Sequence, residues 1–494
     1  MTRTWTCALS VALTMLTSPA AHAADLLGVV EDTLDHDATL AASRDAYRAA
    51  MQAVPKARAG LMPRVQGGWG RAYNGIVMED FPTQHYWQSG WTVSLVQPIF
   101  DWSLWTAYRQ ADYVVARGKL ETASATQDAI LRAAQAYFDA LAAEDELARA
   151  TAYRAALDTH YAQLVRAKAA GEATLVDLRE AESSRAQAQV QWLDAQSQAR
   201  LTRLALERLT GKPPGALAVL PAQVAPPALA PADVEPWVTQ AQTRAYAVQI
   251  GEMALQVAKF DTQKAQAAHY PNVSLQVTHT PAGAGGGYSR PTTTTTGMLQ
   301  VTIPVFSGGE TTALTREAQA LEDKARDELE AAVRDAAANA RDGWLRVNAG
   351  VERSQALAQS ARRALVATRI GFRAGSRTSV DVLRATDALY ASQRDQIRAR
   401  YDTVLALLKL LAEAAILDLD EVGRLNTQLF GREGEGKTVD VPAPMRATTI
   451  VEAHTAEPAR LPEKAASPET APYARRPMSA AEMAPAASVS GAVW

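Results

Sequence analysis

Apolar and polar residues alternate with a period of two in four short segments, and this pattern predicts β-strands. In the second half of the chain the segments are 273–278 and 299–305. In the first half, 91–95 alternates in the same way, whereas 65–74 is glycine-rich and less regular. The polar segment 283–296, which contains three consecutive glycines and a run of threonines, is predicted to be a flexible loop between two strands.

Long stretches with helical periodicity follow each pair of strand segments. Segments 101–170 and 307–374 are rich in Ala, Gln, Glu and Arg, and Asp101 and Ser307 at their starts are predicted N-caps. At 1.5 Å per residue each helix would be about 100 Å long, whereas an average globular helix has about 11 residues. Helices of this length are typical of coiled coils and spacers.

Amphipathic helices are predicted before the strands, and further helices are predicted to return after the long ones. Pro55 lies inside the first of these helices and is expected to kink it or end it locally. The predicted ranges are 25–60 and 234–268 before the strands, and 175–210 and 379–429 after the long helices.

Three short motifs recur in the same order in both halves of the chain, at offsets of 208, 206 and 204 residues. Their central residues are Pro63 and Pro271, Pro98 and Pro304, and Asp177 and Asp381. The nearly constant offset indicates an internal duplication. The predicted divisions are a signal peptide at 1–23, a first repeat at 24–210, a linker at 211–236, a second repeat at 237–430 and a disordered Pro- and Ala-rich tail at 431–494.

Composition narrows the class of protein. The chain has 494 residues, of which 48% are hydrophobic, a formal net charge of −3 and a mean hydropathy of −0.15. The balanced charge gives no reason to expect a nucleic-acid partner. Beyond the N-terminus no run of about 18 apolar residues occurs, which excludes a helical membrane span. Cys7 is the only cysteine, so disulfides and cysteine-rich metal sites are excluded.

The N-terminus has the pattern of a secretory signal peptide. Arg3 precedes an apolar core at 5–16, and Ala21-His22-Ala23 is a small-residue cleavage motif. We therefore expect an exported protein that begins at Ala24 after processing.

Aromatic residues gather near the ends of the predicted strands, as they do at the lipid interfaces of transmembrane barrels. They are Trp69, Tyr73, Tyr86, Trp87, Trp91 and Tyr288. In lipid no sheet edge can stay open, so four strands cannot span a membrane unless several protomers pool them. Two protomers would give eight strands and a filled barrel, whereas three would give twelve and an open lumen. A small sheet packed on the helices is the alternative.

Several motifs together resemble the TolC family of outer membrane channel proteins, and the likeness covers about 25–429. The matching residues are Pro63 and Pro271 at strand starts, 98–101 and 304–309 at the junctions of strand and helix, and 209–211 and 375–383 at helix ends. The resemblance implies a mainly α, internally duplicated fold with a small β part. It further implies a homotrimer whose four strands per protomer complete a 12-stranded transmembrane β-barrel, with a coiled-coil tunnel of helices across the periplasm of a Gram-negative cell.

The resemblance also implies partners. These are a periplasmic adaptor and an inner-membrane ABC transporter or proton-driven pump. The tryptophan-rich first strands and the overall pattern look most like the members that export protein toxins in type I secretion. The outer membrane component of a drug-efflux pump is the alternative.

In the family, acidic residues after the second helix turn ring the periplasmic entrance, and Asp381 matches the first of them. Arg384 stands at the second acidic position, which argues against a strongly cation-selective entrance, and it could pair with Asp381 across one helical turn. Arg377 matches a basic position that helps to hold the entrance closed, and Phe372 replaces a common tyrosine. Asp177 is the repeat equivalent of Asp381. The alternative for all these charges is an ordinary solvated helix surface.

No catalytic, cofactor or metal site is predicted. The histidines show no metal-binding spacing, and no nucleophile elbow or phosphate-binding loop occurs. The chain is therefore not expected to be an enzyme. A periplasmic adaptor and a soluble coiled-coil protein remain as weaker alternatives.

Overall fold

The computed structural model of the protein describes residues 24–78, 81–221, 229–282, 292–356, 358–431 and 439–440. The chain divides into two units, 1–442 and 443–494, and every described residue belongs to the first unit. The predicted signal peptide, Tyr288 and most of the predicted tail lie outside the described residues. Two residues of that tail, Val439–Asp440, form strand β6, which pairs in parallel with β3 (Leu229–Ala230) of the predicted linker.

Four strands form one antiparallel sheet, in the order β1-β2-β4-β5. They are β1 (Arg64–Met78), β2 (Phe81–Phe100), β4 (Asn272–Ala282) and β5 (Thr292–Thr302). The pairing of β2 with β4 joins the two halves of the chain. All four predicted strands are confirmed, but the threonines at 292–296 belong to β5 and not to a loop, since β-branched residues favour strands.

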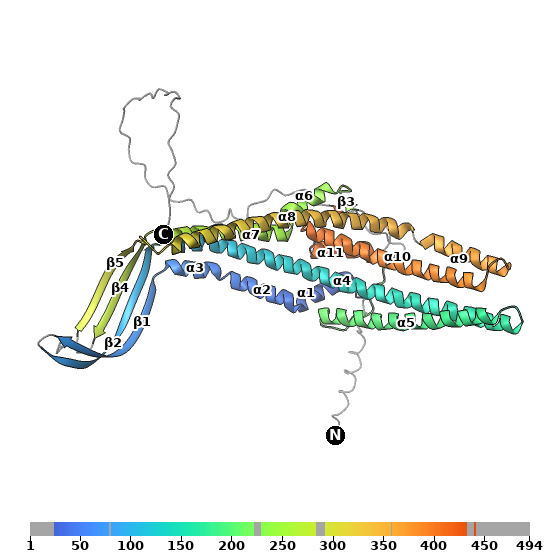
Figure 1. Ribbon diagram of the computed structural model, residues 1–494, viewed down its shortest axis with the longest axis horizontal. Coiled ribbons are helices and arrows are strands. Elements are labelled where there is room, and N and C mark those ends of the chain that lie inside the picture. The colour runs from blue at the N-terminus through green and yellow to red at the C-terminus, as the bar shows by residue number, and fades with distance from the viewer. Residues whose placement is uncertain are drawn as a thin grey trace, which may run out of the picture. The chain divides into compact units, whose positions relative to one another are not determined.

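The helices of this unit run alongside one another, and the four-stranded sheet lies at one end of them (Figure 1). They are α1 (Leu26–His36), α2 (Ala38–Ala50), α3 (Ala53–Leu61), α4 (Trp102–Ala169), α5 (Leu175–Thr210), α6 (Glu235–Arg244), α7 (Tyr246–Ala267), α8 (Glu310–Ala356), α9 (Ala358–Arg373), α10 (Ser379–Glu413) and α11 (Leu419–Phe430). The fold is therefore mainly helical with a small sheet, as predicted.

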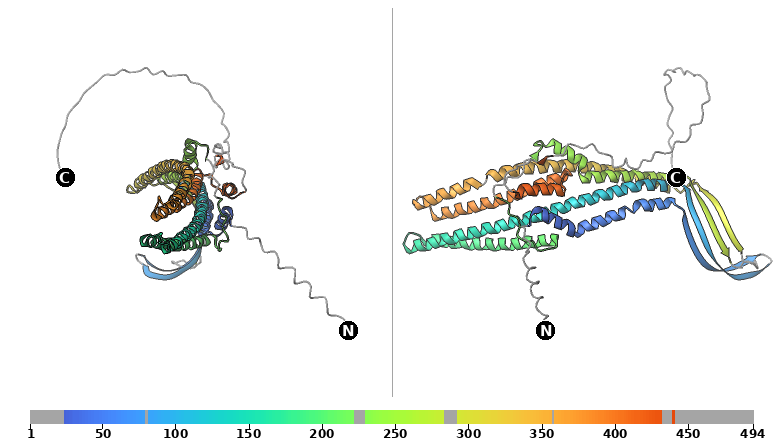
Figure 2. Two further views of the ribbon diagram at one scale, coloured as in Figure 1. Left: turned by 90° about the vertical axis from the view of Figure 1, so that its right-hand side faces the viewer. Right: turned by 180° about the vertical axis from the view of Figure 1, so that it is seen from behind.

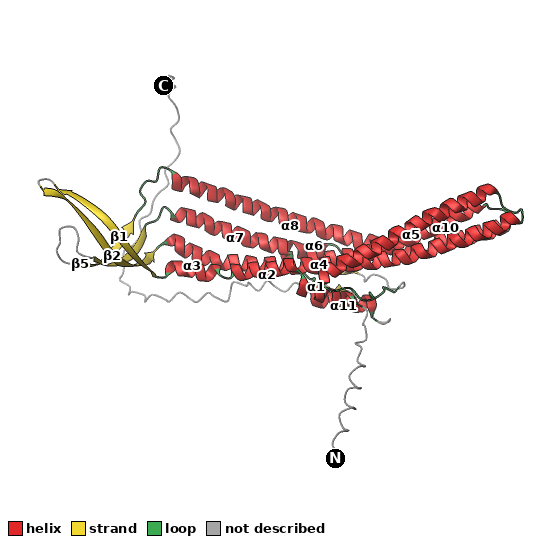
Figure 3. Cartoon of the chain, turned by 90° about the horizontal axis from the view of Figure 1, so that it is seen from below, coloured by secondary structure: helices red, strands yellow, loops and turns green. Residues whose placement is uncertain are grey.

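Helix α4 is the centre of the packing, with α7 and α3 beside it near the sheet and α5 and α10 beside it farther away. Helix α8 packs on α7 and then on α10. Away from the sheet the helices thus form a row in the order α5-α4-α10-α8, which is seen in the right-hand view of Figure 2. Figure 3 shows from below that α8, α7 and α3 run alongside one another nearer the sheet. Helices α5 and α8 lie at the two ends of this row.

The predicted helix 25–60 is divided into three helices. It breaks at Asp37, which caps α2 by accepting a hydrogen bond from the Thr39 backbone N–H at 2.8 Å and pairs with Arg132 of α4. Burial disfavours the charged Asp37, but the hydrogen bonds from Thr39 and Arg132 outweigh this and lower its pKa to about 2. The second break, at Met51–Gln52, lies directly before the first turn of α3, which contains Pro55. A proline is tolerated in the first turn because its missing N–H would have no partner there, so the predicted local interruption near Pro55 is confirmed.

The junction between β2 and α4 is a single residue, Asp101. Its side-chain Oδ1 accepts a hydrogen bond from the Leu104 backbone N–H at 3.1 Å, which confirms the predicted N-cap. Helix α4 then continues to Ala169 without a break. The end of the sheet and the whole of this helix are therefore joined rigidly.

The junction between β5 and α8 is longer, because residues 303–309 separate them. Gly308 and Gly309 have φ values of 64° and 90°, in the left-handed region that favours glycine. Helix α8 consequently begins at Glu310, and the prediction of Ser307 as N-cap is wrong. Its carbonyl oxygen accepts from the Glu310 backbone N–H at 3.2 Å in a turn before the helix.

Two further predicted helices are interrupted. Segment 234–268 breaks at Ala245, whose ψ of 134° is extended. Segment 379–429 breaks after Glu413, where Ala415 has a φ of 52°, and Asp418 caps the separate helix α11 by accepting from the Glu421 backbone N–H at 2.8 Å. The predicted helix 175–210 is confirmed as α5.

The main core lies where α4, α8 and α10 pack with α1, α6 and α11. Its largest fully buried side chains include Tyr137, Phe138, Trp237, Leu407, Leu408 and Leu411. Helices α8 and α10 lie close together at Gly350, where an added Cβ would overlap the Thr403 Oγ1. Glycine therefore sets the distance between these two helices.

Candidate functional site

One face of the four-stranded sheet is apolar across all four strands. Residues opposite each other in an antiparallel pair lie on the same face, and the register places Val65 opposite Leu95, Leu95 opposite Val277, and Val277 opposite Gly297. The large side chains on this apolar face are Val65, Trp69, Tyr73, Val77, Trp87, Trp91, Val93, Leu95, Leu275, Val277, Leu299 and Val301. None of them is buried.

The opposite face of the sheet is polar. Gln276 donates a hydrogen bond through Nε2 to Gln300 Oε1 at 2.7 Å, and Asn74 donates through Nδ2 to Gln88 Oε1 at 3.1 Å. Further residues of this polar face are Gln66, Thr92, Ser94, Ser274, Thr278 and Thr296. The sheet therefore separates an apolar surface from a surface that water can solvate.

Four of the predicted aromatic residues lie together on the apolar face. Trp69 is opposite Trp91 in the register, and the Tyr73 ring centroid is 5.0 Å from that of Trp87. Tyr86 is different, because it pairs with Asn74 and lies on the polar face. Its position one residue from Trp87 reverses its direction, since successive strand side chains point to opposite faces.

A second group of exposed aromatic residues lies where the sheet meets the helices, and the sequence analysis missed it. Its members are Phe100, Trp102, Trp105, Tyr270 and Phe306. Phe100 is nine residues from Trp91, or about 30 Å along the strand at about 3.3 Å per residue. With a strand tilt of about 40°, the two aromatic levels are about 23 Å apart, close to the apolar band of about 25 Å in transmembrane barrels. The sequence feature that could have revealed this group is the position of its members beside the strand-to-helix motifs.

Both ends of the helical row expose apolar side chains. Helix α5 exposes a stripe that contains Val190, Leu193, Leu201 and Leu204. At the other end, α8 and α9 expose Leu314, Leu321, Leu345, Val366 and Ile370. The sheet also has two unlike borders, because within the described residues its open edges are β1 of the first half and β5 of the second half. A head-to-tail ring of copies would bring two unlike borders of this kind together.

The predicted entrance residues lie at the two helix turns at the far end of the helices from the sheet (Figure 1). Gly171 and Gly375, with φ values of 80° and 75°, close the turns before α5 and α10. Each following helix then begins with a capping box, formed by Thr174 with Asp177 and by Thr378 with Asp381. The structure thus places Asp177 and Asp381 in equivalent positions at one end of the bundle.

Asp381 has a structural role at this turn. Its Oδ2 accepts from the Thr378 backbone N–H at 3.0 Å, and the hydrogen bonds with Thr378 hold its pKa below the usual range, with smaller contributions from the charges of Arg377 and Arg384. All three charged residues are described, and the structure records no ion pair between Asp381 and Arg384. The predicted i to i+3 pair is therefore not formed, and Asp381 stays ionised beside two arginines.

Helices α4 and α10 are linked by buried polar contacts that the sequence analysis did not identify. Tyr153 Oη donates a hydrogen bond to Asp387 Oδ1 at 2.5 Å, and its ring centroid is 5.0 Å from that of Tyr390. Burial raises the pKa of Tyr153, and the nearby Asp387 carboxylate raises it further. Leu157 and Leu383 pack around these rings.

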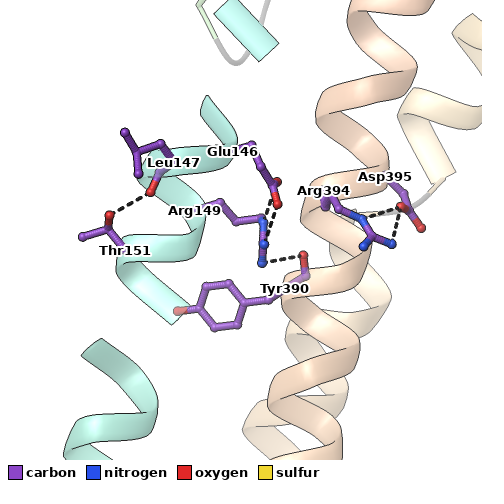
Figure 4. A network of polar contacts seen from close by, with 7 residues as sticks. All are labelled: Glu146, Leu147, Arg149, Thr151, Tyr390, Arg394 and Asp395. Carbon is purple, nitrogen blue, oxygen red and sulfur yellow. Dashed lines mark hydrogen bonds and ion pairs between the residues drawn. The ribbon is translucent and has the colours of Figure 1, made fainter. Parts of the chain in front are cut away.

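Arg149 makes a second link between the same helices (Figure 4). Its side chain is only 8% exposed, and its guanidinium pairs with Glu146 at 2.7 Å on its own helix. Nη1 also donates to the Tyr390 backbone carbonyl of α10 at 3.5 Å. A buried arginine needs such partners, because an unpaired buried charge is costly.

His160 is a third contact, about two turns of helix beyond Tyr153 toward the helix turns. It lies within 3.2 Å of the buried Ser379 Oγ at the start of α10. Burial lowers the pKa of His160, the charge of Arg369 on α9 lowers it further, and Asp177 on α5 opposes them. Four helices, α4, α5, α9 and α10, therefore bring a titratable group, two charges and a hydroxyl together here.

Within the part of the chain that the structure describes, no group of three His, Cys, Asp or Glu residues could hold a metal ion. No helix in these same residues combines the length and the apolarity that a membrane crossing requires.

Comparison with known proteins agrees with this geometry. The family model described as outer membrane efflux protein matches residues 29–212 and 237–414. The chain is 28% identical over 459 residues to the alkaline protease secretion protein AprF of Pseudomonas aeruginosa, covering 88% of this chain and 94% of that protein. It is 28% identical over 440 residues to the outer membrane protein TolC of Vibrio cholerae, covering 85% and 97%.

Among solved structures, the outer membrane protein VceC of Vibrio cholerae has a similar fold. The TM-score is 0.67 at 18% identity, and the match covers 79% of this chain and 95% of VceC.

Proposed function

Because the chain belongs to the outer membrane efflux protein family, which consists of transport channels and not enzymes, we propose that three copies assemble into one channel. The protein lies in the outer membrane and extends into the periplasm, as its relatives do. In the proposed trimer, twelve strands form a membrane barrel and the helices form a tunnel.

The sheet supports this assembly. Its apolar face fits lipid, its polar face fits a water-filled lumen, and its open edges β1 and β5 must be paired in a membrane. Three protomers with four strands each give twelve strands and a lumen, whereas two would give a barrel filled by its own side chains. The apolar stripe of α5 would then contact the α8 and α9 border of the next protomer, which continues the ring along the helices.

The cargo is proposed to be a protein, specifically a cyclolysin-like toxin exported by a type I system with an ABC transporter and an adaptor. The named function of AprF, the secretion of an alkaline protease, supports export of proteins. Drug efflux is the second candidate, and the family description as efflux protein favours it. Both need the same trimeric channel and differ in the inner-membrane partner.

The experiment compares deletion and complementation in a cell that has this gene. We expect the full-length chain to occur as heat-resistant trimers in the outer membrane fraction and to conduct ions in planar bilayers. Deletion should abolish extracellular toxin, and the chain should restore it, with no change in sensitivity to drugs. Toxin export that persists while drug sensitivity rises would favour the efflux pump, and a soluble periplasmic monomer would contradict the channel itself.

Substitution of Arg377 is expected to open the helix-turn end. Arg377→Ala or Arg377→Ser removes an exposed cation beside Asp381, and by resemblance this cation helps to hold the entrance closed. We expect a larger open fraction in single-channel recordings. The matched control is Arg373→Ala, which removes a charge near the same end of α9. If single-channel recordings of wild type and of the Arg377 variants do not differ, Arg377 does not help to hold the entrance closed.

Acidification is expected to weaken the contact at His160. Its lowered pKa means that the folded protein prefers the neutral imidazole, so this contribution is complete above the ordinary value near 6.5 and is lost as the pH falls through the lower folded value. The apparent melting temperature of wild type should therefore fall from pH 7.5 to 5 by a few degrees more than that of His160→Gln. The exposed His269→Gln should behave as wild type, and identical pH profiles for all three proteins would contradict the prediction.

A further inference from the structure

The hairpin of β1 and β2 is longer than the rest of the sheet. The last pair between β2 and β4 is Gly90 with Ala282, but β1 and β2 stay paired as far as Met78 and Phe81. Among the described residues, the outer part of this hairpin, residues 71–78 and 81–89, therefore has no paired strand of the second half beside it. We call these residues the hairpin extension.

The hairpin extension carries a cluster of aromatic and basic side chains on its apolar face. The Arg71 guanidinium carbon lies 4.5 Å from the centroid of the Trp87 ring. The Tyr73 ring stacks on His85 at 5.6 Å and lies 5.0 Å from Trp87. Arg71, Tyr73, His85 and Trp87 are all exposed. They are joined into one cluster by contacts across the two strands.

Within the part of the chain that the structure describes, Arg71 has no carboxylate partner. The structure records ion pairs for many arginines, but among the described residues none holds Arg71. Its contact with Trp87 is a cation–π contact, which does not use up the N–H donors of the guanidinium. These donors match the geometry of phosphate oxygens.

The level of the cluster relative to a bilayer follows from the two aromatic groups described above. If the apolar band extends from Phe100 to Trp91, then Arg71 lies two residues beyond Trp69, or about 7 Å along the strand, and Trp87 lies four residues beyond Trp91, or about 13 Å. Lipid headgroups lie just outside the hydrocarbon, and aromatic rings are enriched there. The cluster is thus at the depth of the phosphates on the side of the membrane away from the helices.

We propose that Arg71, supported by Trp87 and Tyr73, binds the anionic phosphate headgroup of a lipid in the outer leaflet. The proposal rests on the proposed barrel. It adds a lipid ligand that the channel function does not require. Trp87 holds the guanidinium by the cation–π contact, Tyr73 packs against Trp87, and the apolar face below receives the acyl chains.

The test uses the full-length chain, reconstituted in vesicles of phosphatidylcholine with phosphatidylglycerol and then re-extracted in mild detergent. Mass spectrometry of the intact trimer counts the lipids of each type that remain bound. We expect the lipids bound to wild type to be enriched in phosphatidylglycerol. In Arg71→Gln this enrichment should be about fivefold lower, because that factor is the contribution of one cation near the membrane surface. Arg71→Lys keeps the charge without the planar fork and should be intermediate.

The matched control is Arg64→Gln, on the same strand but at its other end and on the polar face. It should retain the wild-type lipid ratio. An unchanged ratio in Arg71→Gln, or an equal loss in Arg64→Gln, would overturn the lipid site while trimers and conductance remain normal, which leaves the channel function standing. Failure of wild type to form conducting trimers would instead overturn the channel and the lipid site together.

Discussion

Replacing Val277 by arginine is expected to stop the chain from assembling in the outer membrane. Val277 pairs with Leu95, about midway between the aromatic levels at Trp91 and Phe100, and its side chain lies on the apolar face. An arginine facing lipid at the midplane costs about 2–4 kcal/mol. Three protomers would together lose roughly 6–12 kcal/mol, which is comparable with the whole stability of a domain, about 5–15 kcal/mol.

The neighbouring residue provides the control. Gln276→Arg adds the same charge to the same strand, but on the polar face, and should leave assembly intact. Heat-resistant trimers in the outer membrane fraction are the readout. If both variants assemble equally well, or if Gln276→Arg alone fails, then the apolar face does not contact lipid.

Substitution of Gly350 should have the second large effect, in the helical part. An added Cβ would lie 2.1 Å from the Thr403 Oγ1 and 3.0 Å from its Cβ, and Thr403 is buried on α10. Gly350→Ala must therefore displace Thr403 or push α8 away from α10, and overpacking of this kind costs about 1–3 kcal/mol. The expected result is a lower thermal stability of the purified protein, measured by the loss of helical circular dichroism.

Removing the overlap with Thr403 tests whether steric contact causes the loss of stability. In the double variant Gly350→Ala with Thr403→Ala, the hydroxyl and methyl groups are gone and most of the lost stability should return. Thr403→Ala alone should have a small effect. If the double variant is as unstable as the sum of the two single variants, the steric explanation is wrong, because coupled neighbours do not add.

The sheet could be predicted largely from sequence because strand periodicity is local. In 273–278 odd-numbered and even-numbered residues point to opposite faces of the sheet. Val277 and Gln276 can therefore be assigned to the apolar and the polar face from the sequence alone. The same rule explains the error at Tyr86, which was grouped with Trp87 by proximity although the two residues point to opposite faces. The internal duplication also predicted that both halves of the chain have the same order of helices and strands.

The contacts between the helices could not be predicted in this way. Tyr153 and Asp387 are 234 residues apart, and nothing in the local pattern of either residue indicates the other. The start of a helix was predictable only where the side chain of a capping residue determines it. Asp101 and Ser307 are both good capping residues, but two glycines after Ser307 allow a turn that moves the helix start to Glu310.

The difference between the two junctions has a mechanical consequence. Torque applied to α4 at its far end is carried through Asp101 directly into β2, because no flexible residue lies between them. Torque applied to α8 is absorbed by the left-handed pair Gly308 and Gly309 before it reaches β5. In the proposed channel, a movement at the far end of α8 would therefore reach the sheet less directly than the same movement of α4.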